Sequence, residues 1–245
     1  MSLADKLVSS FLAFELDINI QTPVHIKRTQ ALKEFEKLGF PTKKDEAWKY
    51  TSLKSILKED FTIFSKKKNV LEFKNVKNYF LDNTETYKIV FVDGFFDPFL
   101  SQTSHDGVDI CILSAALTKP VYSKIISKYF DTSINTKDSL SLINTAFAKE
   151  GVYVHIPKNK ILDKPIEVLH FTTGNEAALM LQPRNLIVVE ENAQVEIIET
   201  HQSLTENPIF TNSVTEIFVG QNAHLDYYKI QNDRLMSSLI DNTYI

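Results

Sequence analysis

Residues 187–196 read Ile-Val-Val-Glu-Glu-Asn-Ala-Gln-Val-Glu, and residues 217–226 repeat the pattern thirty positions later as Ile-Phe-Val-Gly-Gln-Asn-Ala-His-Leu-Asp. A looser copy at 154–162, Val-His-Ile-Pro-Lys-Asn-Lys-Ile-Leu, places Asn159 where the other two copies have their asparagine. The apolar residues before each asparagine alternate with a period of two, which is typical of a β-strand. Asparagine tolerates a left-handed backbone, so it can turn a corner between two short strands.

A strand, an asparagine corner and a second strand that recur at a fixed period predict a stacked β-solenoid. We expect equivalent corners of successive coils at Asn159, Asn192 and Asn222. The alanines of the two closer copies, Ala193 and Ala223, should pack inward, because larger side chains would push the coils apart. The alternative is a pair of β-hairpins that share a turn type by chance.

Length and composition narrow the choice of protein class. A chain of 245 residues with 43% hydrophobic residues can bury the core of one large or two small domains. A net charge of −4 gives no reason to expect nucleic-acid binding. The single cysteine, Cys111, excludes an intramolecular disulfide framework and any cysteine-based metal site built by this chain alone. Because the first residues lack an apolar signal core and no run of eighteen apolar residues occurs, we expect a soluble, cytoplasmic protein without membrane contact.

The N-terminal third of the sequence has helical patterns. Residues 3–16 carry apolar side chains at mostly helical spacing. The Thr22-Pro23 pair offers an N-cap and a first-turn proline for a second helix, which Gly39 should end as a left-handed cap. Its apolar face should contain Ala31, Phe35 and Leu38. The segment 41–53 predicts a short helix that places two aromatic residues near its neighbours, Trp48 and Tyr50.

The pattern changes after a lysine run at 66–68, which we interpret as a loop tip. Residues 87–92 form an apolar strand, and Asp93-Gly94 predicts a tight turn into a return strand that begins at Phe95. Two helices should follow, one opening at Pro120 and one capped by Asp138 and ending at Gly151. Beyond them we expect strands alone, at 152–156, 166–171, 186–189, 195–198, 215–219 and 225–230.

Three regions follow from these patterns. We expect a mainly helical region over 1–86, a mixed α/β connecting region over 87–150 and parallel β-helix coils over 151–245. The fold class is therefore α+β, with an N-terminal helical region followed by a parallel β-helix.

The residue types that enzymes need are scarce or poorly spaced. The six glycines lie too far apart for a P-loop or a dinucleotide fingerprint. No His-x-His motif of a cupin-like metalloenzyme occurs; Glu199 and His201 share a strand face, but two ligands are too few and a surface pair is the common outcome. Cys111 lies in an apolar run and should behave as a small hydrophobic residue. Tyr227 and Tyr228 should point to opposite faces, so they cannot form a carbohydrate-stacking platform.

Three further stretches resemble a known family. They are residues 46–51, Glu-Ala-Trp-Lys-Tyr-Thr; residues 144–157, Asn-Thr-Ala-Phe-Ala-Lys-Glu-Gly-Val-Tyr-Val-His-Ile-Pro; and residues 184–189, Arg-Asn-Leu-Ile-Val-Val. In this order they resemble the SufB/SufD family of iron–sulfur cluster assembly proteins, and the Trp-Lys-Tyr-Thr element favours its SufD branch. The resemblance implies a right-handed parallel β-helix and a non-catalytic scaffold that pairs with a SufB-like paralogue and a SufC-like ATPase.

The resemblance also implies that the iron–sulfur cluster belongs to the complex and not to this chain alone. Members of the family are considerably longer, with further coils and a C-terminal helical region, so the β-helix is expected to be C-terminally truncated here. The functionally important histidines and cysteines of the family lie in that further part. We therefore expect no catalytic, cofactor-binding or metal-binding residue in this chain, and His201 and His224 match no ligand of the family.

Two alternatives and one consequence complete the expectations. A β-helical or cupin-like metal-binding enzyme is the main alternative to the scaffold, because four of the six histidines lie in the strand-rich part. A carbohydrate-active β-solenoid is a weaker alternative.

A last coil around 217–230 should leave an unpaired strand edge or an apolar end face over 225–245, through which the chain would associate with a partner or form a homodimer.

Overall fold

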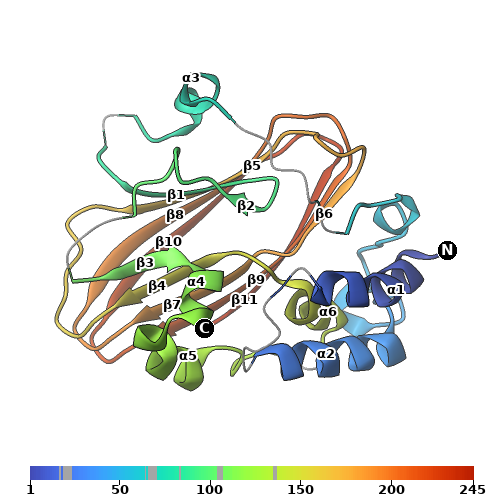
Figure 1. Cartoon of the computed structure of the whole chain (residues 1–245), viewed down its shortest axis with the longest axis horizontal. Coiled ribbons are helices and arrows are strands. Elements are labelled where there is room, and N and C mark those ends of the chain that lie inside the picture. Colours follow the sequence, from blue (N-terminus) through green and yellow to red (C-terminus); the bar gives the residue numbers. More distant parts are fainter. Residues whose placement is uncertain are drawn as a thin grey trace.

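The computed structural model describes residues 1–16, 18, 24–63, 65, 71–82, 84–103, 107–134 and 137–245. It confirms the predicted α+β fold, in which N-terminal helices precede a parallel-strand β-solenoid (Figure 1). The helices are α1 Leu3–Glu15, α2 Val24–Leu38, α3 Phe73–Val76, α4 Leu113–Thr118, α5 Ser123–Tyr129 and α6 Ser139–Phe147. The strands are β1 Tyr87–Val92, β2 Phe95–Phe96, β3 Asp109–Ile112, β4 Val152–Ile156, β5 Ile166–Thr172, β6 Leu179–Leu181, β7 Arg184–Val189, β8 Gln194–Ser203, β9 Ile209–Val219, β10 His224–Asn232 and β11 Ser237–Tyr244.

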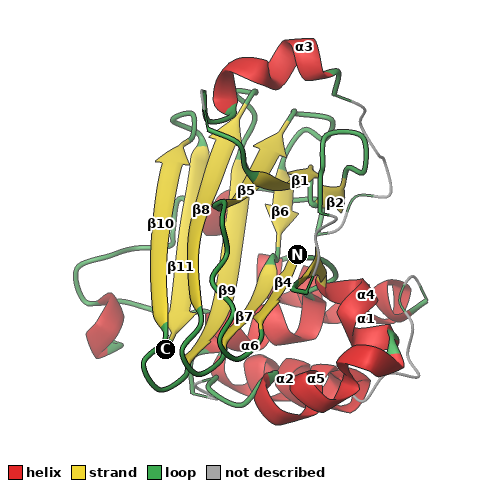
Figure 2. Ribbon diagram, turned by 90° about the vertical axis from the view of Figure 1, so that its left-hand side faces the viewer, coloured by secondary structure: helices red, strands yellow, loops and turns green. Residues whose placement is uncertain are grey.

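The solenoid consists of two facing sheets. One has the strand order β10-β8-β5-β1-β2, and the other has the order β11-β9-β7-β4-β3, with β6 paired to β9. Strands of successive coils pair in parallel; the antiparallel pairs are β1 with β2 and β3 with β4, at the first coils. Figure 2 shows the stack from the side, with β10 and β11 at one end.

The repeat found in the sequence aligns in space as expected. Ile187 of β7 pairs with Val154 of β4 on one side and with Ile217 of β9 on the other. In the second sheet Val195 of β8 pairs with Leu225 of β10. Because these pairs are parallel and belong to successive coils, the alternative of two hairpins is wrong.

The asparagine corners are left-handed, as predicted. Asn159, Asn192 and Asn222 have φ angles of 62°, 56° and 54°. The N–H of Asn159 donates to the carbonyl oxygen of the coil above at Glu191, 3.0 Å away, and the N–H of Asn192 donates likewise to Gln221 at 3.0 Å. The Asn192 amide also donates to Asn159 Oδ1 at 3.0 Å, so the corners stack directly.

Isoleucine and valine side chains fill the solenoid interior near these corners. Ala193 is fully buried among them, as predicted, and Ala223 of the last coil packs against the same core. Other members include Ile89, Val154, Val168, Ile187, Val195, Ile197 and Ile217. Fully burying one such side chain contributes about 1.5–3 kcal/mol, so this half of the interior stabilises the stack.

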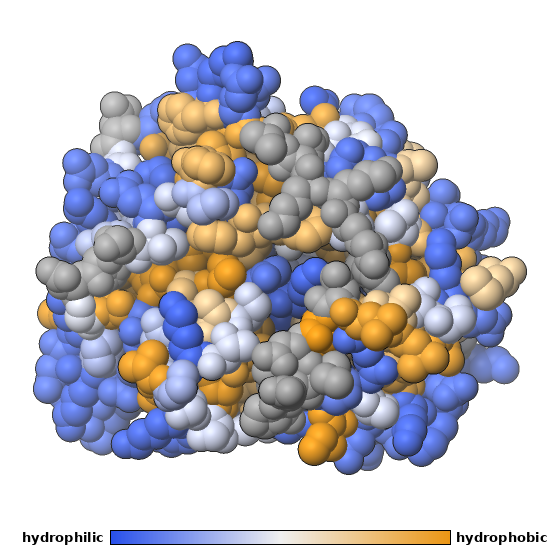
Figure 3. All heavy atoms as spheres, viewed as in Figure 1, coloured by the Kyte–Doolittle hydropathy of each residue, from blue (hydrophilic) through white to orange (hydrophobic). Residues whose placement is uncertain are grey.

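Helices and loops cover the outer faces of both sheets. Helices α4 and α5 contribute a cluster that packs on Tyr153 and Val188 of one sheet. The segment around α3 packs Val76 and Phe80 on the outer face of the other sheet. Helices α1, α2 and α6 form a third cluster, which contacts β9 through Phe210. On the face in Figure 3, hydrophobic atoms lie in several patches separated by hydrophilic ones.

Several local expectations need correction. On α2, Ala31 and Phe35 are buried as predicted, but Leu38 is 54% exposed, and Arg28 and Leu32 complete the buried stripe. Tyr50 is 88% exposed, although Trp48 packs near the helices as expected. Helix α6 ends at Phe147, before Gly151, and strands β3, β6 and β11 were not predicted.

Other expectations about the helices and loops hold or lie outside the structure. Asp138 caps α6 by accepting from the N–H groups of Leu140 and Ser141. Gly39 has a φ of 68°, as a left-handed cap should. The expected N-cap at Thr22-Pro23 and the loop tip at 66–68 lie outside the described residues.

The end of the stack is open along two strands. β10 and β11 each form the last strand of their sheet. Large apolar side chains are exposed here, with Leu235 99% exposed, Ile245 90%, Tyr228 53% and Ile230 45%. Within the described residues β10 and β11 thus pair on one side only, at the position predicted for the edge near 225–245. No helix within the described ranges is long and apolar enough to cross a membrane.

Candidate functional site

The solenoid interior becomes polar away from the asparagine corners. On the inner face of β8, Val195 and Ile197 are followed by Glu199, His201 and Ser203. On β5 the inner face likewise passes from Val168 to His170 and Thr172. Glu199 is 1% exposed, His201 4% and His170 8%, so the polar groups are as buried as the apolar ones.

Glu199 is the centre of this polar interior. Its Oε1 lies 2.9 Å from His170 Nε2 and accepts from the Asn185 amide at 3.2 Å. Its Oε2 accepts from the Tyr227 hydroxyl and lies 3.4 Å from Lys229 Nζ. Lys229 also contacts Asp241 of the opposite sheet. The carboxylate is therefore held from several sides by groups of three adjacent coils.

The two histidines are stacked ring on ring. Strand register places Phe91, His170 and His201 side by side on adjacent strands. The ring centroids of Phe91 and His170 are 5.1 Å apart with an interplanar angle of 10°, and those of His170 and His201 are 4.5 Å apart with an angle of 9°. The stack fixes the planes of both imidazoles, so their edges point to Glu199.

Burial and charge set the protonation of the cluster. Burial alone would raise the pKa of Glu199, but Lys229 and the contact with His170 hold that pKa well below its ordinary value. Burial, and then the neighbouring His201, lower the pKa of His170. At neutral pH the site therefore contains an ionised carboxylate beside a neutral imidazole.

His201 has an unusual environment. Its Nε2 lies 3.6 Å from Glu199 Oε1, beyond hydrogen-bond distance. This buried nitrogen has no hydrogen-bond partner within the part of the chain that the structure describes. A buried polar atom without a partner costs about 1–3 kcal/mol and calls for an explanation.

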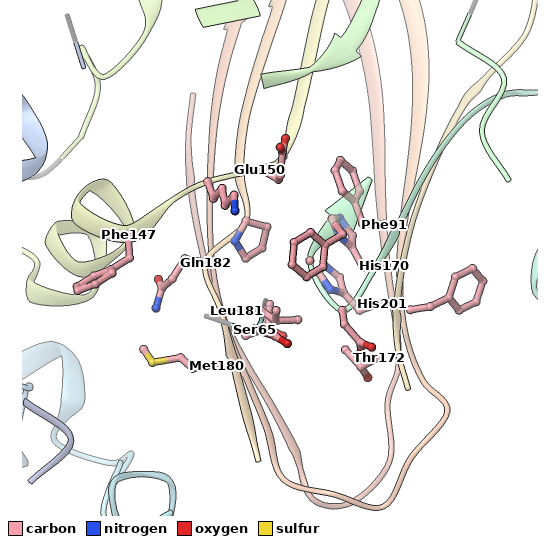
Figure 4. Close-up of a pocket in the computed structure, with 18 of the residues that line it drawn as sticks. Ser65, Phe91, Phe147, Glu150, His170, Thr172, Met180, Leu181, Gln182 and His201 are labelled. Atoms are coloured by element: carbon pink, nitrogen blue, oxygen red, sulfur yellow. The ribbon is translucent and has the colours of Figure 1, made fainter. Parts of the chain in front are cut away.

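A cavity of about 80 Å³ adjoins both imidazoles. Figure 4 shows His170 and His201 beside Phe91 on one wall, with Leu181 and Gln182 on the opposite wall. Such a volume is enough for a few water molecules or a hydrated ion. The two imidazoles can therefore face a small guest in this cavity, and the carboxylate of Glu199 lies next to both of them.

Of the three residues His170, Glu199 and His201, sequence analysis singled out Glu199 and His201 but expected them on the surface. Glu199 and His201 share a strand face, as predicted, but the expected surface pair is wrong because both are buried. The third residue, His170, comes from the preceding coil and pairs in register with His201. His224, by contrast, is exposed.

The remaining candidates behave as structural residues. Cys111 is half-buried on β3, and burial raises the pKa of its thiol to about 11, which disfavours a nucleophilic role. Tyr227 points inward to Glu199 and Tyr228 is 53% exposed, so the two do face opposite ways. Among the six histidines of the sequence, His105 lies outside the described residues.

A second buried ionic network lies on the outer face of the other sheet. Arg184 Nη2 lies 2.7 Å from Glu216 Oε2 and 3.1 Å from Asp131 Oδ1. Glu216 also accepts from the N–H groups of Asp131, Thr132 and Ser133. With every oxygen of Glu216 occupied, this network fastens the loop after α5 to β7 and β9 and leaves no ligand position open.

Comparison with known proteins agrees with this architecture. Residues 11–168 match the SufBD protein N-terminal region, and residues 170–245 match the SufBD core domain of SUF system FeS cluster assembly. The chain belongs to the SufBD family.

Individual relatives support the assignment to the family. An iron–sulfur cluster assembly SufBD family protein of Synechocystis is 31% identical over 222 residues, which cover 84% of this chain and 47% of the relative. The iron–sulfur cluster assembly protein SufD of Escherichia coli is 25% identical over 211 residues, covering 85% and 46%. SufD of Bacillus subtilis is 28% identical over 116 residues, covering 45% and 26%. The chain thus spans about half the length of the first two relatives.

Proposed function

We propose that this chain is a non-catalytic scaffold subunit of the SUF iron–sulfur cluster assembly complex, of the SufD type, which pairs with a SufB-like paralogue and a SufC-like ATPase. The observation that carries the proposal is the succession of the two SufBD matches, which together extend from residue 11 to residue 245. The relatives named SufD in Escherichia coli and Bacillus subtilis support the SufD type. In this proposal the cluster forms at the level of the complex.

In the chain as given, the strands β10 and β11 offer an edge on which further strands can add, whether from later coils of a longer chain or from a partner. β10 and β11 present unpaired backbone groups on their outer sides, and such edges add strands of a partner readily. Exposed apolar side chains flank this edge, including Tyr228 and Ile230. The three regions 1–86, 87–150 and 151–245 remain our proposed division, with the last one carrying the pairing surface.

Co-purification tests the proposal. A full-length parent protein that carries this chain should be isolated together with its SufB-like and SufC-like partners from the same organism. Retention of both partners through gel filtration supports the scaffold role. Failure to co-purify with either partner contradicts it.

One backbone substitution tests the edge itself. His224 N–H donates to the carbonyl oxygen of Ala193, the residue before β8, at 2.9 Å. Because donors alternate sides along a parallel strand, Gln231 N–H points away from β8. Gln231→Pro removes that donor without removing a β8–β10 bond. In the 245-residue chain we expect this variant to weaken pairing, whereas Gln231→Ala should pair as the wild type does; equal pairing by both variants would place the contact elsewhere.

A further inference from the structure

Three potential metal ligands converge inside the solenoid. His170 Nε2, His201 Nε2 and Glu199 Oε1 can each offer one ligand atom, and these atoms all lie within 4.8 Å of one another. We propose that His170, Glu199 and His201 bind one divalent first-row transition-metal ion, such as Fe²⁺, Co²⁺ or Zn²⁺. This site does not depend on the proposed scaffold role, because it is argued from the interior geometry alone.

The distances suit a single ion. Two ligand atoms that each lie about 2.1 Å from one ion are roughly 3.0–3.5 Å apart in octahedral or tetrahedral geometry. The Nε2 of His170 lies 2.9 Å and that of His201 3.6 Å from Glu199 Oε1, on either side of this range. An ion would replace the contact between His170 and Glu199, and the two imidazole rings, which now lie nearly parallel, would tilt so that both Nε2 atoms point at it.

The partnerless nitrogen of His201 is the independent sign of a guest. His201 is 4% exposed, and its Nε2 has no hydrogen-bond partner among the residues placed by the structure. Both histidines border the cavity of about 80 Å³, so there is room for an ion and for water in its remaining positions. A metal ion would satisfy this nitrogen, which would otherwise remain a buried unpaired group.

The surroundings resemble the outer sphere of a metal site. Asn185 and Tyr227 hold the carboxylate of Glu199, and the aromatic stack with Phe91 holds the ring of His170. Such contacts fix first-shell ligands and strengthen metal binding. The ammonium of Lys229 lies 3.4 Å from Glu199 Oε2, but it also forms an ion pair with Asp241. Two carboxylates and one ammonium leave one net negative charge among these three side chains, which favours a cation.

The ligand set selects the class of metal. Imidazole nitrogen and carboxylate oxygen, which are neither strongly hard nor strongly soft donors together, suit Fe²⁺, Co²⁺ and Zn²⁺. With three protein ligands, the metal ion keeps at least one coordination position for water or another ligand. Cys111 lies on β3 of the other sheet, so no thiolate of this chain joins the set and neither Cu⁺ nor a cluster is favoured.

Metal titration of the 245-residue chain tests the site. Tag-free protein, stripped with a chelator, is titrated anaerobically with Co²⁺ by visible absorption and with Zn²⁺ by calorimetry. We expect one ion per chain, and an affinity at least tenfold lower in His201→Gln and in Glu199→Gln. Absence of saturable binding, or binding by both variants equal to that of the wild type, would overturn the proposal.

His155 provides a matched control. It also contacts two carboxylates, Asp109 through Nδ1 at 3.0 Å and Glu190 through Nε2 at 3.3 Å. Because opposite ring nitrogens are used, one ion cannot join all three groups. His155→Gln should therefore bind metal as the wild type does, and loss of binding in this variant instead would place the ion outside the solenoid.

A measurement on the wild type covers the case in which a variant does not fold. Circular dichroism shows whether each variant is folded. X-ray absorption of the Zn²⁺-loaded wild type should show nitrogen and oxygen neighbours at about 2.0–2.2 Å with the scattering pattern of two imidazoles. A sulfur neighbour, or oxygen neighbours without imidazole, would show that the assignment is wrong.

Discussion

Ile197 and Glu199 lie two residues apart on the same face of β8, and each is 1% exposed. Ile197 belongs to the half of the interior near the asparagine corners, where aliphatic side chains pack on one another. Glu199 belongs to the other half, where its partners are the polar or charged groups of His170, Asn185, Tyr227 and Lys229. The strand pattern decides which side chains point inward, but it does not decide what the interior is made of.

The two halves differ in what burial contributes. Burying isoleucine is favourable by about 1.5–3 kcal/mol. Burying a carboxylate is unfavourable unless other groups compensate it, and a compensated buried ion pair is often no more stable than apolar residues of the same volume. A solenoid built for stability alone would continue the aliphatic rows. The polar half is therefore the part of the interior that stability does not explain, and function is to be sought there.

The largest expected effect is in the aliphatic half. Ile197→Ala should lower the free energy of unfolding by about 2–5 kcal/mol, because the cavity between stacked coils cannot collapse. Urea denaturation measures the loss. Ile230→Ala makes the same chemical change at a side chain that is 45% exposed and should cost below about 1 kcal/mol. Equal losses in the two variants would mean that the aliphatic rows do not hold the stack together.

The next effect shows that the polar half cannot simply be made apolar. The side-chain oxygen of Asn185 accepts from Val152 N–H at 2.9 Å, and its side-chain nitrogen donates to Glu199 and to Thr215. Asn185→Leu adds hydrophobic bulk, but it removes the acceptor of the buried Val152 N–H and one donor from Glu199, so we expect a loss of about 2–3 kcal/mol.

An exposed asparagine gives the control for that substitution. Asn75→Leu, on the surface of α3, should change the free energy of unfolding by no more than about 0.5 kcal/mol. If Asn185→Leu were neutral or stabilising in the same urea series, the hydrogen bonds of the polar half would contribute nothing.

The comparison also shows what the sequence could predict. The corners were predictable because a left-handed asparagine and its alternating strand are local features, and the repeat places Val195 beside Leu225 at an offset of 30 residues. His170 was not predictable in this way. It pairs with His201 at an offset of 31, and a change of one residue in register turns a side chain to the other face. Only the three-dimensional register brings the third ligand to the site.

Local geometry explains a smaller failure in the N-terminal region. The segment that contains Trp48 and Tyr50 forms only a short 3₁₀ turn, Glu46–Trp48. With three residues per turn, side chains two positions apart do not share a face. Trp48 therefore packs on the helical cluster while Tyr50 is 88% exposed. A short helix was expected to bring both aromatic residues near the neighbouring helices, but the turn brings only Trp48 to them.

A third prediction concerns the corner that defines the aliphatic half. Asn192 has a φ of 56°, which a β-branched residue adopts only with strain. Asn192→Val should cost about 1–3 kcal/mol in the free energy of unfolding. Asn192→Gly relieves the strain and loses only the exposed hydrogen bond to Asn159, so it should recover most of the loss. If valine and glycine were equally destabilising, the side-chain hydrogen bond would matter more than the backbone angle.

The smallest expected effect lies at the edge of the polar half. Asp93 turns the β1–β2 hairpin with a φ of 50° and is 2% exposed. Burial raises the pKa of this carboxyl, although its bonds with Thr173 oppose the change. Asparagine can preserve both contacts, since its oxygen can accept from Thr173 N–H and its amide can donate to the hydroxyl. It also suits an Asn-Gly turn.

Asp93→Asn should therefore stabilise the fold at pH 7, by less than about 1 kcal/mol. The folded protein retains the Asp93 proton to a higher pH than the unfolded chain, whose aspartates have a pKa of about 3.9. The wild type thus loses stability as the pH rises from that value through the pKa of folded Asp93, and asparagine avoids this loss. Urea denaturation from pH 3 to pH 8 should show the advantage of the variant only above that window. Asp93→Ala, which loses both contacts with Thr173, should be less stable than the wild type at every pH. A variant Asp93→Asn that is destabilised equally at pH 3 and pH 8 would show that burial imposes no cost on this carboxylate.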